Sequence, residues 1–353
     1  MNKKIRLEWI DVLRALAILL VVYGHRITYL KNDVDGFWFY EAYSVFLNPI
    51  KMPLFFALSG YLFRIRQGGD LAFFKKTFTS LVIPWLFLGL VPLIISIPFN
   101  GFSHAYESIV ELFTGVLLWF MPCFIIAQII FYYVIKLTKK HLPLTILVLV
   151  VISAIGYMLR QRDIMILFTD NVGKNGFLNI FMINIAMMVQ FYFLIGYLFK
   201  KYENRLRPYR LWLGMVLLVC YIIIGWVTYP GGSTDVHNGA FYSLPVAVSM
   251  TVMGLLALFL LSSCIKKYPN FLLLVGKNSL VIYMLDRYVL MPFLLLFNFK
   301  SPYILNLYIN KIPGTYILTL FIAFIYLFYS STINILIAKI LNKYLPWATG
   351  GRG

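Results

Sequence analysis

Long apolar runs separated by short polar or basic segments dominate the sequence from Ile10 to the region of Tyr329. Many runs approach the ~20 residues that a helix needs to cross ~30 Å of hydrocarbon. Stretches such as residues 13–24 and 211–226 lack the alternation of apolar and polar residues that marks a membrane β-barrel strand, so the pattern predicts helices. The predicted spans are residues 9–29, 43–63, 78–98, 109–135, 143–159, 178–199, 211–229, 241–263, 271–297 and 314–337.

The composition identifies lipid as the solvent around these helices. Of the 353 residues, 61% are hydrophobic and 12% are charged, whereas soluble domains carry roughly 25% charged residues. Backbone groups inside a bilayer must be satisfied within helices or a closed barrel. The sequence therefore predicts an all-α, polytopic membrane protein with a single integral membrane domain over residues 1–353.

The formal net charge is +18, but Lys and Arg stand in short clusters between apolar runs, so we expect no nucleic acid partner. The clusters fall mainly in every second connection, which satisfies the positive-inside rule for an even number of spans. The pattern predicts about ten transmembrane helices with both termini in the cytoplasm. The longest connections, residues 30–42, 160–177 and 298–313, then lie on the outer side.

Charged residues occur inside the first predicted span, where each costs ~2.5–3.5 kcal/mol on insertion scales. At about 100° per residue, Arg14 and His25 share one helix face, about 16 Å apart along the axis. Asp11 can pair with Arg14 at the cytoplasmic rim but lies about 21 Å from His25. Either Arg14 holds an anion from the cytoplasm and His25 is a general base, or both residues make structural contacts.

Lys51 stands between two prolines in the second predicted span, so we expect the helix to break there. The pair Ser59–Gly60 in the same span allows another helix to approach closely. Asp286 and Arg287 stand near the middle of the ninth predicted span, and as neighbours they point about 100° apart. Substrate contact and structural ion pairing both remain open for these charges.

A basic connection precedes the third predicted span and includes Lys75 and Lys76, which either bind phosphates of a nucleotide-like donor or set the topology. In the fourth span, Trp119 precedes the helix breaker Pro122 and either stacks on a substrate ring or packs. The three cysteines have no metal-ligand spacing, so we expect packing roles and no metal: Cys123, Cys220 and Cys264.

Several of these segments, in order, resemble acyltransferase family 3, in particular the branch that O-acetylates surface polysaccharides. They are DVLRALAILLVVYGH at residues 11–25, KMPLFFALSGYLF at 51–63, KK…IPW at 75–85, LWFMP at 118–122 and GKNSLVIYML at 276–285. The first two carry most of the specificity. The resemblance implies ten core helices, a bacterial cytoplasmic (inner) membrane location, and essential roles for His25 and Arg14.

The resemblance also implies transfer of an acetyl group from acetyl-CoA to a sugar hydroxyl of a lipid-linked or surface glycan. We expect Arg14, Lys75 and Lys76 to bind the donor. Residues expected at the acceptor are Lys51, Trp119, Asp286 and Arg287.

The chain departs from the family pattern at two of these positions. Lys51 and Asp286 stand where this branch often has histidine, which affects the identity of the acceptor. Two alternatives to the enzyme are a transporter or exporter of a lipid-linked sugar or polysaccharide, and a catalytically inactive assembly subunit. The sequence assigns no oligomeric state.

Overall fold

The computed structural model of the chain is all-helical apart from two very short strands, in agreement with the predicted all-α fold. It forms two compact units. Unit 1 comprises Met1–Phe55, Arg205–Asp235 and Ala240–Ile340, and unit 2 comprises Phe56–Asn204, Val236–Gly239 and Leu341–Gly353. The prediction of a single domain over residues 1–353 stays a prediction. The structure describes residues 7–30, 38–65, 68–115, 117–161, 182–229, 234–236, 240–241, 243–296 and 316–350.

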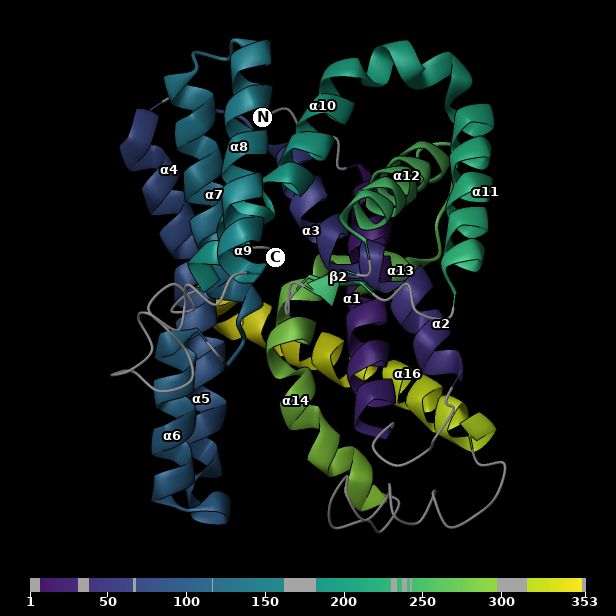
Figure 1. Cartoon of the computed structure of the whole chain (residues 1–353). Helices are drawn as coiled ribbons and strands as arrows, with labels where there is room; N and C mark the ends of the chain where they lie inside the picture. The colour runs from purple at the N-terminus through teal and green to yellow at the C-terminus, as the bar shows by residue number, and fades with distance from the viewer. Residues whose placement is uncertain are drawn as a thin grey trace. The chain divides into compact units, whose positions relative to one another are not determined.

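Unit 1 is built around α1, which packs along α13 and also contacts α12 and α14 (Figure 1). Acidic Glu8 and Asp11 occupy the first turn of α1, where their negative charges interact favourably with the positive end of the helix dipole. The elements of this unit are α1 (Glu8–Leu30), α2 (Trp38–Phe46), the start of α3 (Asn48–Leu62), η4 (Arg207–Tyr209), α11 (Arg210–Thr228), β1 (Thr234–Asp235), β2 (Ala240–Phe241), α12 (Leu244–Ser262), α13 (Asn270–Lys277), α14 (Ser279–Leu296) and most of α16 (Tyr316–Tyr344).

Unit 2 contains two helical pairs that Figure 1 shows side by side, α5 with α6 and α7 with α8. Its aromatic core surrounds the buried Phe56, whose ring lies 5.3 Å from that of Phe120 and 5.9 Å from that of Phe193. The elements are the rest of α3, α4 (Gly69–Thr77), η1 (Phe78–Val82), α5 (Ile83–Asn100), α6 (Phe102–Thr114), α7 (Phe120–Leu137), α8 (Leu142–Gln161), α9 (Ile183–Met188), most of α10 (Gln190–Leu206) and η5 (Pro346–Thr349).

Seven helices within the described ranges are long and apolar enough to cross a membrane. Each of the ten predicted spans overlaps described helix, but the number ten and the cytoplasmic placement of both termini stay predictions. The connections at 30–42, 160–177 and 298–313 lie largely outside the described residues. The seven helical segments are Glu41–Leu62, Gly69–Ile95, Phe120–Leu137, Leu142–Arg160, Ile183–Thr228, Leu244–Ser262 and Phe321–Tyr344.

The predicted break in the second span is displaced from Lys51. Helix α2 ends at Phe46, a turn follows at Leu47, and α3 then runs through Lys51 and Pro53. Pro49 explains this position, because proline lacks a backbone donor and is tolerated in the first turn of the new helix. The amides of Ile50 and Lys51 both donate to the Leu47 carbonyl, which closes the turn.

The fourth predicted span, residues 109–135, also differs from the structure. Helix α6 ends at Thr114, and α7 begins only at Phe120. Pro122 therefore lies in the first turn of α7 and does not break the helix. Backbone N–H groups in a first turn have no acceptor within the helix, so the N–H that proline lacks is not missed.

The close helix approach predicted at Ser59–Gly60 is confirmed within unit 2. A Cβ atom added at Gly60 of α3 would collide with the Phe193 carbonyl of α10. The approach is reciprocal, since a Cβ at Gly196 would collide with the Ala57 carbonyl. Small residues are the usual means by which membrane helices bring their backbones together, because packing replaces the hydrophobic effect as the driving force.

Candidate active site

Helix α1 is unbroken from Glu8 to Leu30, so the helical spacing that places Arg14 and His25 on one face holds in the structure. The predicted pairing of Arg14 with Asp11 is confirmed: the Arg14 Nη1 donates to the Asp11 Oδ1 over 3.3 Å. Asp11 is buried, whereas 32% of the Arg14 side chain is exposed. The buried carboxylate thus orients a guanidinium group that an anionic ligand can still reach.

His25 lies beside a carboxylate that comes from another helix. Its Nδ1 is 3.9 Å from the Oδ2 of Asp286, which belongs to α14 in the same unit. The imidazole is half exposed, at 52%, while the Asp286 side chain is buried, at 4%. This pairing supplies the histidine with the acidic neighbour that α1 alone cannot provide.

Two side chains of α16 fix the Asp286 carboxylate. Its Oδ1 accepts hydrogen bonds from the Tyr326 hydroxyl over 2.9 Å and from the Ser330 hydroxyl over 2.7 Å. The Tyr326 hydroxyl also reaches the backbone carbonyl of Asp286 over 2.8 Å. One turn further along α16, the Asn334 amide donates to the Ser330 oxygen over 3.2 Å. These bonds fall on Oδ1, and Oδ2 is the atom that faces His25.

The docking of α13 against α1 helps to position α14, which follows it after a single residue. A Cβ atom added at Gly276 would collide with the backbone carbonyl of Asp11. At the turn between the two helices, the Asn278 side chain donates to the Leu274 carbonyl over 2.8 Å. The GKNS segment therefore has a structural explanation: its glycine lets two backbones meet, and its asparagine closes the helix end.

Lys51 is connected through Tyr43 to the turn of α1 that carries His25. The Lys51 ammonium lies 5.2 Å from the centre of the Tyr43 ring, within the range of a cation–π interaction. The same tyrosine packs against Gly24, where a Cβ would collide with its ring, and its hydroxyl donates to the Leu20 carbonyl. The structure thus brings Lys51 toward the helix turn next to His25 within unit 1.

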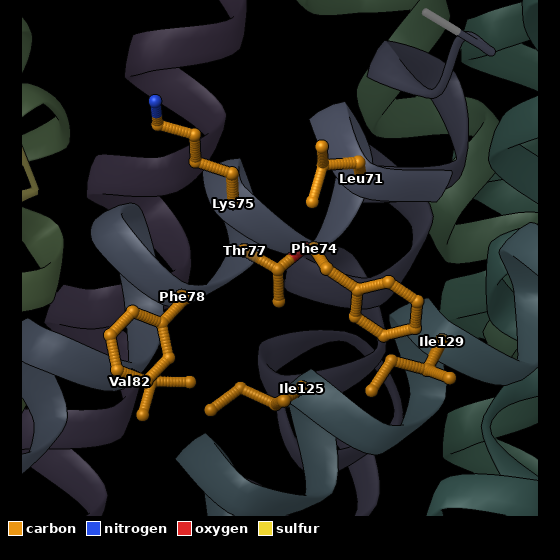
Figure 2. A pocket seen from close by; sticks show the side chains of 8 residues that line it. All are labelled: Leu71, Phe74, Lys75, Thr77, Phe78, Val82, Ile125 and Ile129. Carbon is orange, nitrogen blue, oxygen red and sulfur yellow. The ribbon is translucent and has the colours of Figure 1, made fainter. Parts of the chain in front are cut away.

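Of the other predicted site residues, Arg287 belongs to unit 1, and Trp119, Lys75 and Lys76 belong to unit 2. Arg287 is adjacent to Asp286 in sequence but is exposed. Trp119 precedes the first residue of α7 in unit 2, where its ring meets that of Phe120 edge to face at 6.2 Å. Lys75 and Lys76 are exposed on α4 of unit 2. Lys75 borders an apolar pocket, and Figure 2 shows its ammonium directed away from the apolar side chains.

Tyr326, Ser330 and Tyr43 are candidate site residues that the sequence interpretation missed. The signal for the α16 residues is a spacing of four between polar side chains in an apolar span, which continues to Asn334. All three residues of this stripe are buried. Tyr43 had no such signal, because a tyrosine near the end of a membrane helix is common.

The arrangement is suited to proton transfer. Among the described residues, no group of three or more His, Cys, Asp or Glu could hold a metal ion. Unit 1 places the half-exposed His25 imidazole beside the buried Asp286 carboxylate. The partly exposed Arg14 guanidinium lies on the same face of α1 as His25. A base oriented by a fixed carboxylate is a recurring arrangement in enzymes that activate a hydroxyl group.

Comparison with protein families matches residues 7–339 to the acyltransferase 3 family, described as an acyltransferase domain. No curated protein and no solved structure matches the chain. The family match covers α1, which carries Arg14 and His25, and also α14 and nearly all of α16. Together with the long apolar helices, it shows that the chain belongs to acyltransferase family 3 and is a multi-pass membrane acyltransferase.

Proposed function

We propose that the protein is an O-acetyltransferase that moves an acetyl group from acetyl-CoA to a sugar hydroxyl of a lipid-linked or cell-surface polysaccharide, with His25 as the general base. The observation that carries this proposal is the 3.9 Å approach of the His25 Nδ1 to the buried Asp286 carboxylate. The family match supports acyl transfer over the transport of a lipid-linked sugar. The site lies in the cytoplasmic membrane of a bacterium in this proposal.

Asp286 orients the base rather than contacting the acceptor. A carboxylate facing Nδ1 favours the tautomer that has its proton on this nitrogen, which leaves Nε2 as the proton acceptor. The distance of 3.9 Å is longer than a hydrogen bond, and catalytic hydrogen bonds often tighten only when the substrates bind. Asp286 also stabilises the imidazolium that forms during the reaction.

The chemical step needs no further group. His25 Nε2 takes the proton of the sugar hydroxyl as its oxygen attacks the thioester carbonyl. The new carbon–oxygen bond forms and the carbon–sulfur bond breaks, so the acetyl group passes to the sugar. The imidazolium then returns the proton to the CoA thiolate, which leaves as the thiol. An acetylated His25 is the alternative route, with the same balance of atoms.

Positive charge assists both substrates. Arg14 suits a CoA phosphate, because its guanidinium is planar, permanently charged and partly exposed. Lys75 and Lys76 on the exposed side of α4 are further candidates for the donor phosphates. At the acceptor, Lys51 is a candidate because it lies over the Tyr43 ring, which packs beside His25 at Gly24, and Trp119 and Arg287 are further candidates.

The test is acetyl transfer by purified protein in lipid vesicles, measured as radiolabel passing from acetyl-CoA to the glycan. We expect His25→Ala to lose at least about a hundredfold in rate, the lower end of general base catalysis. His141→Ala is the matched control and should leave the rate unchanged, because His141 is an exposed histidine just before α8. A native rate in His25→Ala would refute the assignment of the base.

A further inference from the structure

Unit 2 has an apolar pocket of about 400 Å³ on α4, η1 and α7, within the size range of ligand sites. Figure 2 labels its eight lining residues. Six are apolar, and the other two are Lys75 and the buried Thr77. Ile125 and Ile129, one turn apart, form the α7 side. The pocket is therefore almost entirely hydrocarbon, with a single charge at one end.

A local irregularity of the helix accompanies the pocket. Residues Phe78–Val82 form a π-helical turn between α4 and α5, and such turns are frequent at functional sites. The turn is compensated locally, since the Thr79 hydroxyl donates to the Lys75 carbonyl over 2.9 Å and the Ser80 hydroxyl to the Lys76 carbonyl over 2.7 Å. The extra residue of a π-turn shifts the side-chain register, so Phe78 and Val82 border a gap beside α7.

The surroundings of the pocket are suited to lipid. Leu71 is 79% exposed, Phe74 40% and Phe78 53%, and all three line it. These side chains belong to or adjoin a segment, Gly69–Ile95, that is apolar enough to cross a membrane. Exposed apolar side chains on such a helix meet hydrocarbon, and a gap between them would leave packing contacts unmade. An acyl chain restores those contacts.

Lys75 is the one charged residue in the lining of this pocket. Its side chain borders the pocket, while its ammonium is directed away from the hydrocarbon lining (Figure 2). Lysines near a membrane surface attract anionic lipid head groups, each by an amount equivalent to about fivefold in affinity. The geometry points to a binding site for an anionic phospholipid, with one acyl chain beside Ile125 and Ile129 and the phosphate on Lys75.

The lipid site gives different roles to two neighbouring lysines, both of which the proposed function lists as candidates for the donor phosphates. Lys76 follows Lys75 in α4, but only Lys75 lines the pocket. The side chains of adjacent helical residues point about 100° apart, so a phosphate group can bind to one of these lysines without contacting the other. Lys75 then serves the lipid, and Lys76 stays available to the phosphates of the donor.

The test is lipid retention by purified protein, measured by native mass spectrometry with phosphatidylglycerol and phosphatidylcholine of identical acyl chains. We expect wild-type protein to prefer phosphatidylglycerol, and Lys75→Gln to reduce this preference about fivefold. Lys76→Gln is the matched control, with the same change of charge one residue away, and should retain the wild-type preference. Equal preference in all three proteins would overturn the site.

A second variant tests the hydrocarbon part of the site. Ile129→Trp should fill the pocket and reduce retention of both lipids, whereas Ile130→Trp, outside the lining, should not. If Ile129→Trp does not fold, the Lys75 comparison decides alone, because Lys75 is exposed. A CoA titration separates this site from the donor site: if Lys75→Gln weakens CoA binding and leaves the lipid preference intact, Lys75 belongs to the donor.

Discussion

The Oδ2 of Asp286 faces the Nδ1 of His25 at 3.9 Å, although 261 positions separate the two residues in the chain. The carboxylate is buried and the imidazole is half exposed. In the proposed function this difference sets their roles, because the buried carboxylate is held in place and the exposed imidazole can reach a substrate. It also gives Asp286 a physical role at a position where the family resemblance implied histidine.

The first prediction concerns the charge of Asp286. Asp286→Asn keeps the size of the side chain but removes the negative charge and allows the wrong histidine tautomer. We expect kcat for acetyl transfer to fall by at least about a hundredfold, with KM for acetyl-CoA little changed. Steady-state kinetics of the reconstituted protein checks this. Glu111→Gln, at an exposed carboxylate of α6, is the control and should keep native kcat. A fully active Asp286→Asn variant would remove the orienting role.

The second prediction concerns the residues that hold Asp286. Ser330→Ala removes one of the two hydroxyl donors to Oδ1, and a hydrogen bond to a charged group contributes about 1–3 kcal/mol. We expect both the melting temperature and kcat to fall, because the carboxylate loses its fixed position. Ser330→Thr keeps the hydroxyl and should recover kcat.

Tyr326→Phe should behave like Ser330→Ala, since it removes the other donor. The comparison with Ser331→Ala separates positioning from simple destabilisation. Ser331 is also buried on α16, but no described residue partners its hydroxyl. If Ser331→Ala lowers kcat as much as Ser330→Ala does, the contact with Asp286 is not what matters.

The third prediction concerns the contact between α1 and α13. Gly276→Ala places a methyl group against the Asp11 carbonyl, and overpacking of this kind costs about 1–3 kcal/mol. We expect a lower melting temperature, and a loss of activity because only one residue separates α13 from α14, which carries Asp286. Asn270→Ala, at an exposed position of α13, should retain native stability in the same thermal unfolding assay. A native melting temperature in Gly276→Ala would contradict the close backbone contact.

Local patterns predicted much of this protein correctly. The helical period placed Arg14 and His25 on one face of an unbroken helix, and the three-residue spacing predicted the Asp11–Arg14 pair. Prolines were less reliable guides, because their effect depends on where the helix begins. Pro122 lies in a first turn and breaks nothing, and the break in the second span falls at Leu47, ahead of Lys51.

The sequence by itself determined the helical membrane fold, since apolar runs of this length leave the backbone no other way to satisfy its hydrogen bonds in lipid. It also determined which residues share a face of one helix, because that depends only on the helical period. Only the tertiary structure decided that Asp286 meets His25 and that Tyr326 and Ser330 fix its carboxylate. Contacts between helices depend on how whole helices pack, and the spacing of residues along one chain does not contain that information.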